Sequence, residues 1–253
     1  MLKDENMNNN EIKIDYERFF SELDRKLDKL WSSIIANSGL AQAVLNGSAT
    51  KELYAIYMIE TYHYTSHNAR NQALVGTRND IESLPYLKFC LEHAADEIGH
   101  QHMALHDIRS IGLISQEFTP PRPLLATETF IAYIYWLSLT GNPLQRLGYS
   151  YWAESCYSYI NPLLSGIQKT LNLQPSQMTF FVAHSDIDAD HFEHVKTIIR
   201  RSCKTSEDLK AIEYALETTL ILTGKILDEV QDEYEIFMRG ESTRYNFLAQ
   251  VSS

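Results

Sequence analysis

Apolar residues recur along most of the chain at the three- to four-residue interval that places them on one face of an α-helix. The N-terminal stripe consists of Phe19, Phe20, Leu23, Leu27, Leu30 and Trp31. Glycine and proline fall mostly between such stretches, where they end helices. The pattern predicts about seven helices, over roughly residues 11–37, 50–75, 81–111, 123–140, 143–171 with a kink at Pro162, 175–202 and 206–238.

These long helices are separated by connections of only a few residues, which is typical of an antiparallel bundle. The 253 residues include only 10 glycines and 7 prolines, too few for the many tight turns of an all-β protein. No change in composition marks a second domain. We therefore expect an all-α, single-domain bundle over residues 11–238, with a disordered tail at 1–10 and a flexible tail at 239–253.

Composition and charge reduce the number of functional classes that fit this sequence. Hydrophobic residues at 44% and charged residues at 22% are ordinary for a globular protein, and no apolar run approaches the roughly 20 residues of a membrane span. The polar, acidic N-terminus lacks the pattern of a targeting signal, so a cytoplasmic location is expected. A net charge of -11 argues against nucleic acid and anionic membranes as partners. A small-molecule function is favoured, with a homodimer as the default assembly.

The histidines are clustered on three predicted helices and alternate with carboxylates. The nine are His63, His67, His93, His100, His102, His106, His184, His191 and His194. Positions i, i+4 and i+7 share one face of a helix, because seven residues make almost two full turns. Two motifs have this spacing, HxxxExxH at His93, Glu97 and His100 and HxxxDxxH at His184, Asp188 and His191.

Such a face can offer three ligands to a metal, but a neighbouring helix must complete the coordination. Glu60, seven residues before His67, is one candidate. Glu154 is another, since it is the only acid in the aromatic stretch 147–157 and is costly to bury unless paired or bound to metal. Mixed carboxylate and imidazole ligands with open positions favour iron or manganese.

This set of residues resembles the six-ligand pattern of the heme-oxygenase-like diiron oxidases and oxygenases, which share a superfamily with TenA and PqqC-like proteins. The stretch 92–112 also resembles the second helix of proteins described as iron-containing redox enzymes. The resemblance covers about residues 15–238 and implies a heme-oxygenase-like fold. It also implies two irons per chain, with Glu60, His67, Glu154, His184, Asp188 and His191 as ligands and Glu97, Asp96, His93 and His100 as additional ligands or neighbours.

The same resemblance implies oxygen-dependent oxidation of a small organic substrate, similar to an amino acid or a fatty acid. Nothing in the sequence selects among N-oxygenation, desaturation and carbon-carbon cleavage. Arg70 and Arg146 are candidates for pairing with a substrate carboxylate, since each lies on a predicted ligand helix. Heme is not expected, because the first predicted helix contains no histidine.

Three alternatives remain open at this point. A metal-free, TenA-like hydrolase would use Cys156 as its nucleophile. A protein without catalytic activity would only bind a ligand on the same scaffold. A ferritin-like di-metal bundle would instead use two ExxH pairs, Glu60 with His63 and Glu97 with His100.

Overall fold

The computed structural model describes residues 14–250, except for the side chains of residues 184–189 and 250. In this part of the chain every regular element is helical, and the all-α prediction is confirmed. The α-helices are α1 (Tyr16–Asn37), α2 (Gly39–Leu45), α3 (Lys51–Thr65), α4 (Asn68–Gly76), α5 (Leu84–Asp96), α6 (Gln101–Ser110), α7 (Leu125–Leu139), α8 (Arg146–Ser155), α9 (Tyr157–Leu171), α10 (Thr179–Ser202) and α11 (Ser206–Met238). Three short 3-10 helices are η1 (Pro143–Gln145), η2 (Pro175–Gln177) and η3 (Asn246–Gln250).

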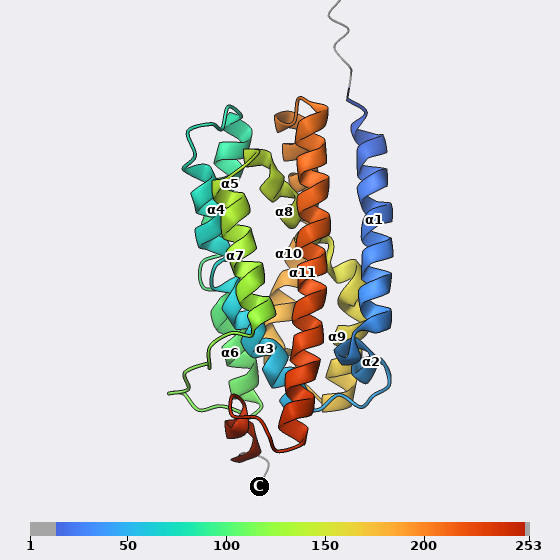
Figure 1. The fold of residues 1–253 in the computed structure, drawn as a ribbon, viewed down its shortest axis with the longest axis vertical. Helices are drawn as coiled ribbons and strands as arrows, with labels where there is room; N and C mark the ends of the chain where they lie inside the picture. Colours follow the sequence, from blue (N-terminus) through green and yellow to red (C-terminus); the bar gives the residue numbers. More distant parts are fainter. Residues whose placement is uncertain (1–13, 251–253) are drawn as a thin grey trace, which may run out of the picture.

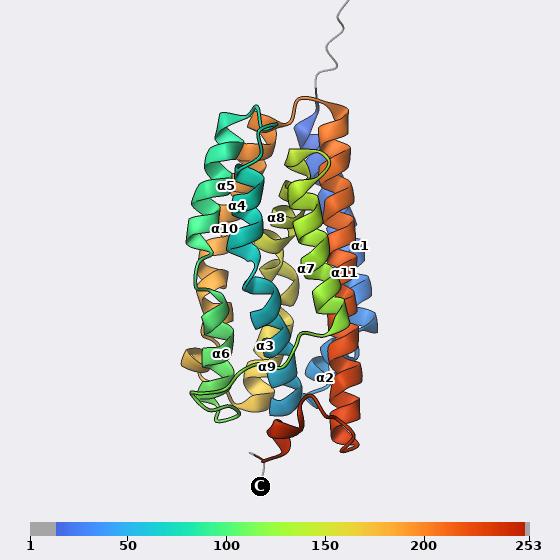
Figure 2. The same ribbon diagram turned by 60° about the vertical axis from the view of Figure 1, so that its left-hand side comes forward.

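The helices run along the long axis of an elongated bundle (Figure 1). The long helix α11 extends over most of the bundle, and α7 lies beside it in both views (Figures 1 and 2). Helix α8 lies inside the bundle, in contact with both α10 and α11. None of the described helices is long and apolar enough to cross a membrane.

The structure divides three of the predicted helices in two. The 50–75 helix breaks at Ser66 and His67, between α3 and α4. The 81–111 helix breaks near Gly99, whose positive φ of 96° is a conformation that glycine adopts without steric cost. The 143–171 helix breaks at Cys156 and not at the predicted Pro162, which lies inside α9. A break rotates the two halves relative to each other, so residues seven apart across it need not share a face.

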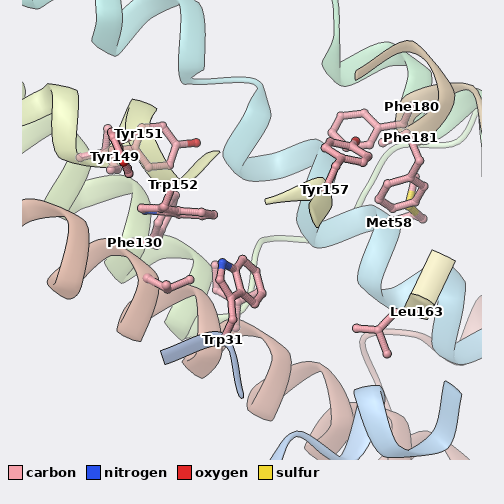
Figure 3. Packing of buried hydrophobic residues seen from close by; sticks show 14 of the residues in the cluster. Trp31, Met58, Phe130, Tyr149, Tyr151, Trp152, Tyr157, Leu163, Phe180 and Phe181 are labelled. Carbon is pink, nitrogen blue, oxygen red and sulfur yellow. The ribbon is translucent and has the colours of Figure 1, made fainter. Parts of the chain in front are cut away.

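The core is rich in aromatic side chains contributed by α1 and α8 (Figure 3). Trp31 packs edge-on against Trp152 with ring centroids 6.1 Å apart, and Phe20 stacks on Tyr151 at 6.0 Å. Aromatic pairs of this kind stabilise the fold by about 0.5–1.5 kcal/mol beyond the burial of their area. These contacts hold α8 in place, and α8 carries part of the site described below.

Helix α8 approaches α11 very closely at Gly148. A Cβ atom at this position would lie 2.1 Å from the carbonyl oxygen of Ile212 and 2.7 Å from the amide nitrogen of Leu216. Nearby, Trp152 Nε1 donates a hydrogen bond to Thr219 Oγ1 over 2.7 Å. Only a residue without a side chain permits this helix-to-helix distance.

The segment after α11 corrects a prediction. Residues 239–253 were expected to form a flexible tail, but Tyr245 and Leu248 are completely buried and the chain forms η3 at the lower end of the bundle (Figure 1). The tyrosine hydroxyl donates a hydrogen bond to Glu60 Oε1 over 2.9 Å. The segment is mostly polar, which suggests a flexible tail, but its side chains Tyr245 and Leu248 fill the end of the core. Residues 1–10 and 251–253 lie outside the described part.

Candidate metal centre

Three side chains from three helices meet inside the bundle: His93 from α5, Glu154 from α8 and His191 from α10. His93 Nε2 lies 2.9 Å from Glu154 Oε1, and His191 Nδ1 lies 3.4 Å from Glu154 Oε2. One ligand atom from each residue falls within 4.8 Å of the others. We call these three residues the triad. Two imidazoles and one carboxylate at such distances can converge on a single ion.

Helix α5 presents His93 through its apolar face. Ser83 caps the start of the helix, and its hydroxyl accepts a hydrogen bond from the Tyr86 amide over 3.3 Å. Tyr86, Phe89 and Cys90 are buried at the spacing of one helix face, and His93 continues this face one turn later. The Phe89 ring stacks on the imidazole at 5.2 Å. Apolar periodicity therefore directs a polar side chain into the interior.

Helix α10 is positioned by a buried carboxylate at its first turn. Asp107 is completely buried and accepts hydrogen bonds from the amide of Thr179 over 2.8 Å and from that of Phe180 over 3.0 Å. A carboxylate at this place satisfies amides that have no partner within the helix and interacts favourably with the helix dipole. Asp107 thus fixes where α10 begins, and with it the position of His191 three turns further on.

Glu154 is a buried but ionised carboxylate. Its side chain is 10% exposed. Burial alone would raise the pKa of this carboxyl, but the hydrogen bonds from His191 and His93 outweigh that effect and lower the pKa from 4.5 to about 2. The site therefore holds a full negative charge at neutral pH, as a carboxylate ligand requires.

More candidate ligands line the same cavity as the triad. Glu97 and His100 face it, with His100 Nδ1 3.7 Å from Glu97 Oε1. Asn68 Nδ2 donates a hydrogen bond to Glu97 Oε2 over 3.3 Å. Asp96, in contrast, lines a separate hollow on the outer side of His93 and His191. Of the additional residues suggested by the sequence, His93 thus belongs to the triad, Glu97 and His100 lie beside it, and Asp96 does not face the central cavity.

The structure does not bring Glu60 and His67 to the triad. Glu60 is completely buried, accepting hydrogen bonds from the Leu124 amide over 3.0 Å and from the Tyr245 hydroxyl over 2.9 Å. His67 Nδ1 pairs with the Tyr135 hydroxyl over 2.9 Å. The expected Glu60–His67 face does not exist, because the chain breaks between α3 and α4 before His67. Glu60 instead joins the start of α7 to the C-terminal segment.

The remaining predicted residues have varied surroundings. The side chains of His184 and Asp188 lie outside the described residues. Cys156 and Arg146 line the triad's cavity, whereas Arg70 is exposed. The fold is not that of a ferritin-like bundle, and the first ferritin-like pair does not form, because His63 Nε2 lies 2.8 Å from the Pro121 carbonyl oxygen. The second pair, Glu97 with His100, does lie together beside the triad.

The sequence suggests His93 only as an additional ligand, whereas in the structure it contacts Glu154 directly. Its motif gives no sign of this partner, because Glu154 lies 61 residues away on a separate helix. The spacing of residues within one helix shows which of them share a face. It does not show which other helix packs against that face. The signal that was present is the repetition of one spacing on two helices, at His93 and at His184.

Replacement of Glu60 by glutamine tests its structural assignment. Burial raises the pKa of this carboxyl above 4.5, against hydrogen bonds that lower it. The folded state then holds a proton that the unfolded state has released, so this group's contribution to stability falls as pH rises from about 4.5 through the raised pKa. We expect Glu60→Gln to remove this part of the pH dependence, measured by urea unfolding at a series of pH values.

Iron content distinguishes this assignment from the ligand role suggested by the sequence. Glu60→Gln should bind as much iron as the unmodified protein, because the triad is untouched. If Glu60→Gln bound less iron while its helicity and unfolding midpoint were unchanged, Glu60 would be an iron ligand after all.

Solved structures resemble this fold closely. A protein from Shewanella denitrificans, described as a domain of unknown function with a heme oxygenase-like fold, is 51% identical, with a TM-score of 0.87 over 92% of this chain and 98% of its own. A TenA homologue from P. horikoshii is 13% identical, with a TM-score of 0.66 over 84% of this chain and 97% of its own. Heme oxygenase-1 from Synechocystis, solved with heme, is 16% identical, with a TM-score of 0.66 over 88% and 98%.

The last two similarities concern the fold alone. No significant match is found among the curated proteins. Residues 55–222, well over half of the chain and including the whole triad, match the family described as iron-containing redox enzyme. This protein therefore belongs to the iron-containing redox enzyme family and has a heme-oxygenase-like fold.

Proposed function

We propose that the protein is an oxygen-dependent, non-heme iron oxidase or oxygenase that acts on a small organic substrate. The observation that carries the proposal is the triad, in which two imidazoles and a carboxylate ionised at neutral pH converge inside a cavity. Two histidines and one carboxylate with open positions are typical of non-heme iron(II) oxygenases. Family membership agrees with this chemistry.

The surroundings of the triad fit a bound ion. His93 Nδ1 is buried and has no hydrogen-bond partner among the described residues. A buried polar atom left unpaired costs about 1–3 kcal/mol, so an ion bound by this nitrogen would remove that cost. The ring is held by its stacking on Phe89 and by Glu154. A rigid histidine that is incompletely satisfied by the protein is suited to ligation.

Further ligands would come from Glu97 and His100, which face the same cavity. We propose that they contribute to a second iron, together with His184 and Asp188, which the resemblance assigns as ligands. Mixed carboxylate and imidazole donors suit iron, whereas the thiolates preferred by structural zinc are absent from the set.

Each part of the chain has a separate task in this proposal. Bound iron supplies a centre that can reduce dioxygen and so oxidise an organic molecule. Glu154 would offset the positive charge of a bound ion, and His93 and His191 would ligate the ion through their neutral imidazoles. The rings of Tyr57 and Phe181, stacked with centroids 6.3 Å apart, line the cavity and give it an apolar wall.

Iron loading followed by exposure to oxygen tests the proposal. Protein purified without oxygen and supplied with ferrous iron should bind about two irons per chain and consume dioxygen when air is admitted. Metal analysis and an oxygen electrode measure these two results. Protein that binds no ferrous iron under these conditions would contradict the assignment.

The alternatives give different results in the same experiment. Cys156 lines the cavity, so a cysteine-dependent reaction must be tested. Cys156→Ser should leave iron binding and oxygen uptake unchanged, whereas a metal-free hydrolase would show neither property in any form of the protein. Iron binding without oxygen uptake would favour a protein that only stores or senses its ligand.

A further inference from the structure

A single arginine is buried in the wall of the triad's cavity. Arg146 is 1% exposed and is among the largest completely buried side chains. It lies on α8 with Ser150 and Glu154, at intervals of four residues that place all three on one face. At 1.5 Å per residue, the backbone positions of Arg146 and Glu154 are about 12 Å apart along the helix. The arginine therefore lines the cavity about two helical turns away from Glu154 of the triad.

The hydrogen bonds of Arg146 do not use all of its donors. Nε and Nη2 both donate to Asn71 Oδ1, over 3.0 and 2.8 Å, and Nη1 donates to Ser150 Oγ over 3.0 Å. A guanidinium has five N–H groups, so two have no acceptor among the described residues. The Tyr149 ring lies 4.3 Å from Cζ and covers one face of the group.

The positive charge is also without a direct ionic partner in the described part of the chain. Every hydrogen-bond acceptor of Arg146 is a neutral amide or hydroxyl oxygen. Glu97 acts on the guanidinium only through space, and it is hydrogen-bonded to Asn68. Burying a charge costs several kcal/mol unless an opposite charge and hydrogen bonds compensate it. Arg146 stays charged at neutral pH even when buried, so the cavity wall holds a cation that an anion can neutralise.

The rest of the cavity indicates what the anion is attached to. Much of its remaining wall is formed by apolar side chains from α1, α2, α9 and α11, including Ile34, Leu40, Leu163 and Ile226. The cavity volume is about 180 Å³. An engineered apolar cavity of about 150 Å³ admits benzene, so this space suits one aromatic ring or a chain of roughly eight carbons.

We propose that the cavity binds a small monocarboxylic acid, with its carboxylate on Arg146 and its apolar part against the apolar wall beside the triad. The planar guanidinium can form two parallel hydrogen bonds with a carboxylate, which matches the two donors that remain. The inference names the substrate class of the proposed enzyme and so rests on the proposed function. The two can fail separately, because binding of the acid requires no iron.

The test uses metal-free, full-length protein and isothermal titration calorimetry. The probes are 3-phenylpropionate and octanoate, each compared with its neutral amide, which has nearly the same size. We expect at least one acid to bind about tenfold or more tightly than its amide, since hydrogen bonds to a charged group are stronger than neutral ones. This comparison needs no variant, so it holds even if substitutions at Arg146 disturb folding.

Variants of Arg146 then test whether this residue supplies the positive charge that binds the acid. Arg146→Lys and Arg146→Gln should weaken binding of the acid by about tenfold or more and reduce its advantage over the amide, with folding checked by circular dichroism. Arg70→Gln, at an exposed arginine outside the cavity, is the matched control and should bind like the unmodified protein. Equal affinity for acid and amide, or no binding of either acid, would overturn the proposal. Loss of iron binding alone would leave it standing.

Discussion

Replacement of Glu154 by glutamine should abolish iron binding at the triad while the helices remain intact. Glutamine has almost the same size, so the packing around Trp152 and Tyr157 is retained. It lacks the negative charge that a pKa of about 2 guarantees in the unmodified protein. Loss of a charged ligand exceeds the 10- to 100-fold effect typical of residues that only orient ligands, so we expect iron affinity to fall by at least about 100-fold.

A nearby acid provides the control for this experiment. Glu193 lies on α10, two residues after His191, but its side chain is 67% exposed and pairs with Lys196 at the surface. Glu193→Gln should bind iron like the unmodified protein, because an exposed ion pair contributes little. Iron titrations followed by metal analysis compare the two variants. Unchanged iron affinity in Glu154→Gln would remove the triad as the binding site.

Replacement of Gly148 by alanine should strongly destabilise the fold. The new Cβ would lie 2.1 Å from the Ile212 carbonyl oxygen and 2.7 Å from the Leu216 amide nitrogen. Both atoms belong to the backbone of α11, so only a separation of α8 from α11 relieves the clash. Overpacking of this severity should lower the free energy of unfolding by about 3 kcal/mol or more.

Gly166 on α9 is the matched comparison. A Cβ there would approach Val44 Cγ1 at 2.8 Å, but that atom is the end of a side chain that can move. Alanine also favours a helix by about 1 kcal/mol over glycine, so Gly166→Ala should cost much less. Urea unfolding followed by circular dichroism measures both variants. Similar stabilities for the two would show that α8 and α11 are not constrained at Gly148.

The sequence predicts the helical class well because apolar periodicity is a local property. It predicts Glu154 and His191 as residues of one site because a lone acid in an aromatic stretch and a histidine motif both require partners when buried. In the structure these two residues are in contact. The helix count is less well predicted, since breaks at Cys156 and near Gly99 depend on how neighbouring helices pack.

The position of Glu60 shows where sequence reasoning fails. Its separation from His67 suits one helix face, but that argument assumes an unbroken helix. The chain breaks at Ser66, and Glu60 binds the start of α7 and Tyr245 from the C-terminal segment. No pattern near Glu60 indicates a partner 185 residues away. The choice between a buried ligand and a buried structural acid depends on long-range contacts that spacing does not encode.

The position of bound iron is the strongest test of the triad as a metal site. Crystals grown without oxygen and loaded with ferrous iron can be measured on both sides of the iron absorption edge, which locates the metal independently of any assumed ligand. We expect an anomalous peak within bonding distance of His93, Glu154 and His191. A peak beside Glu60 and Tyr245 or at the surface, with none between the three triad residues, would contradict it.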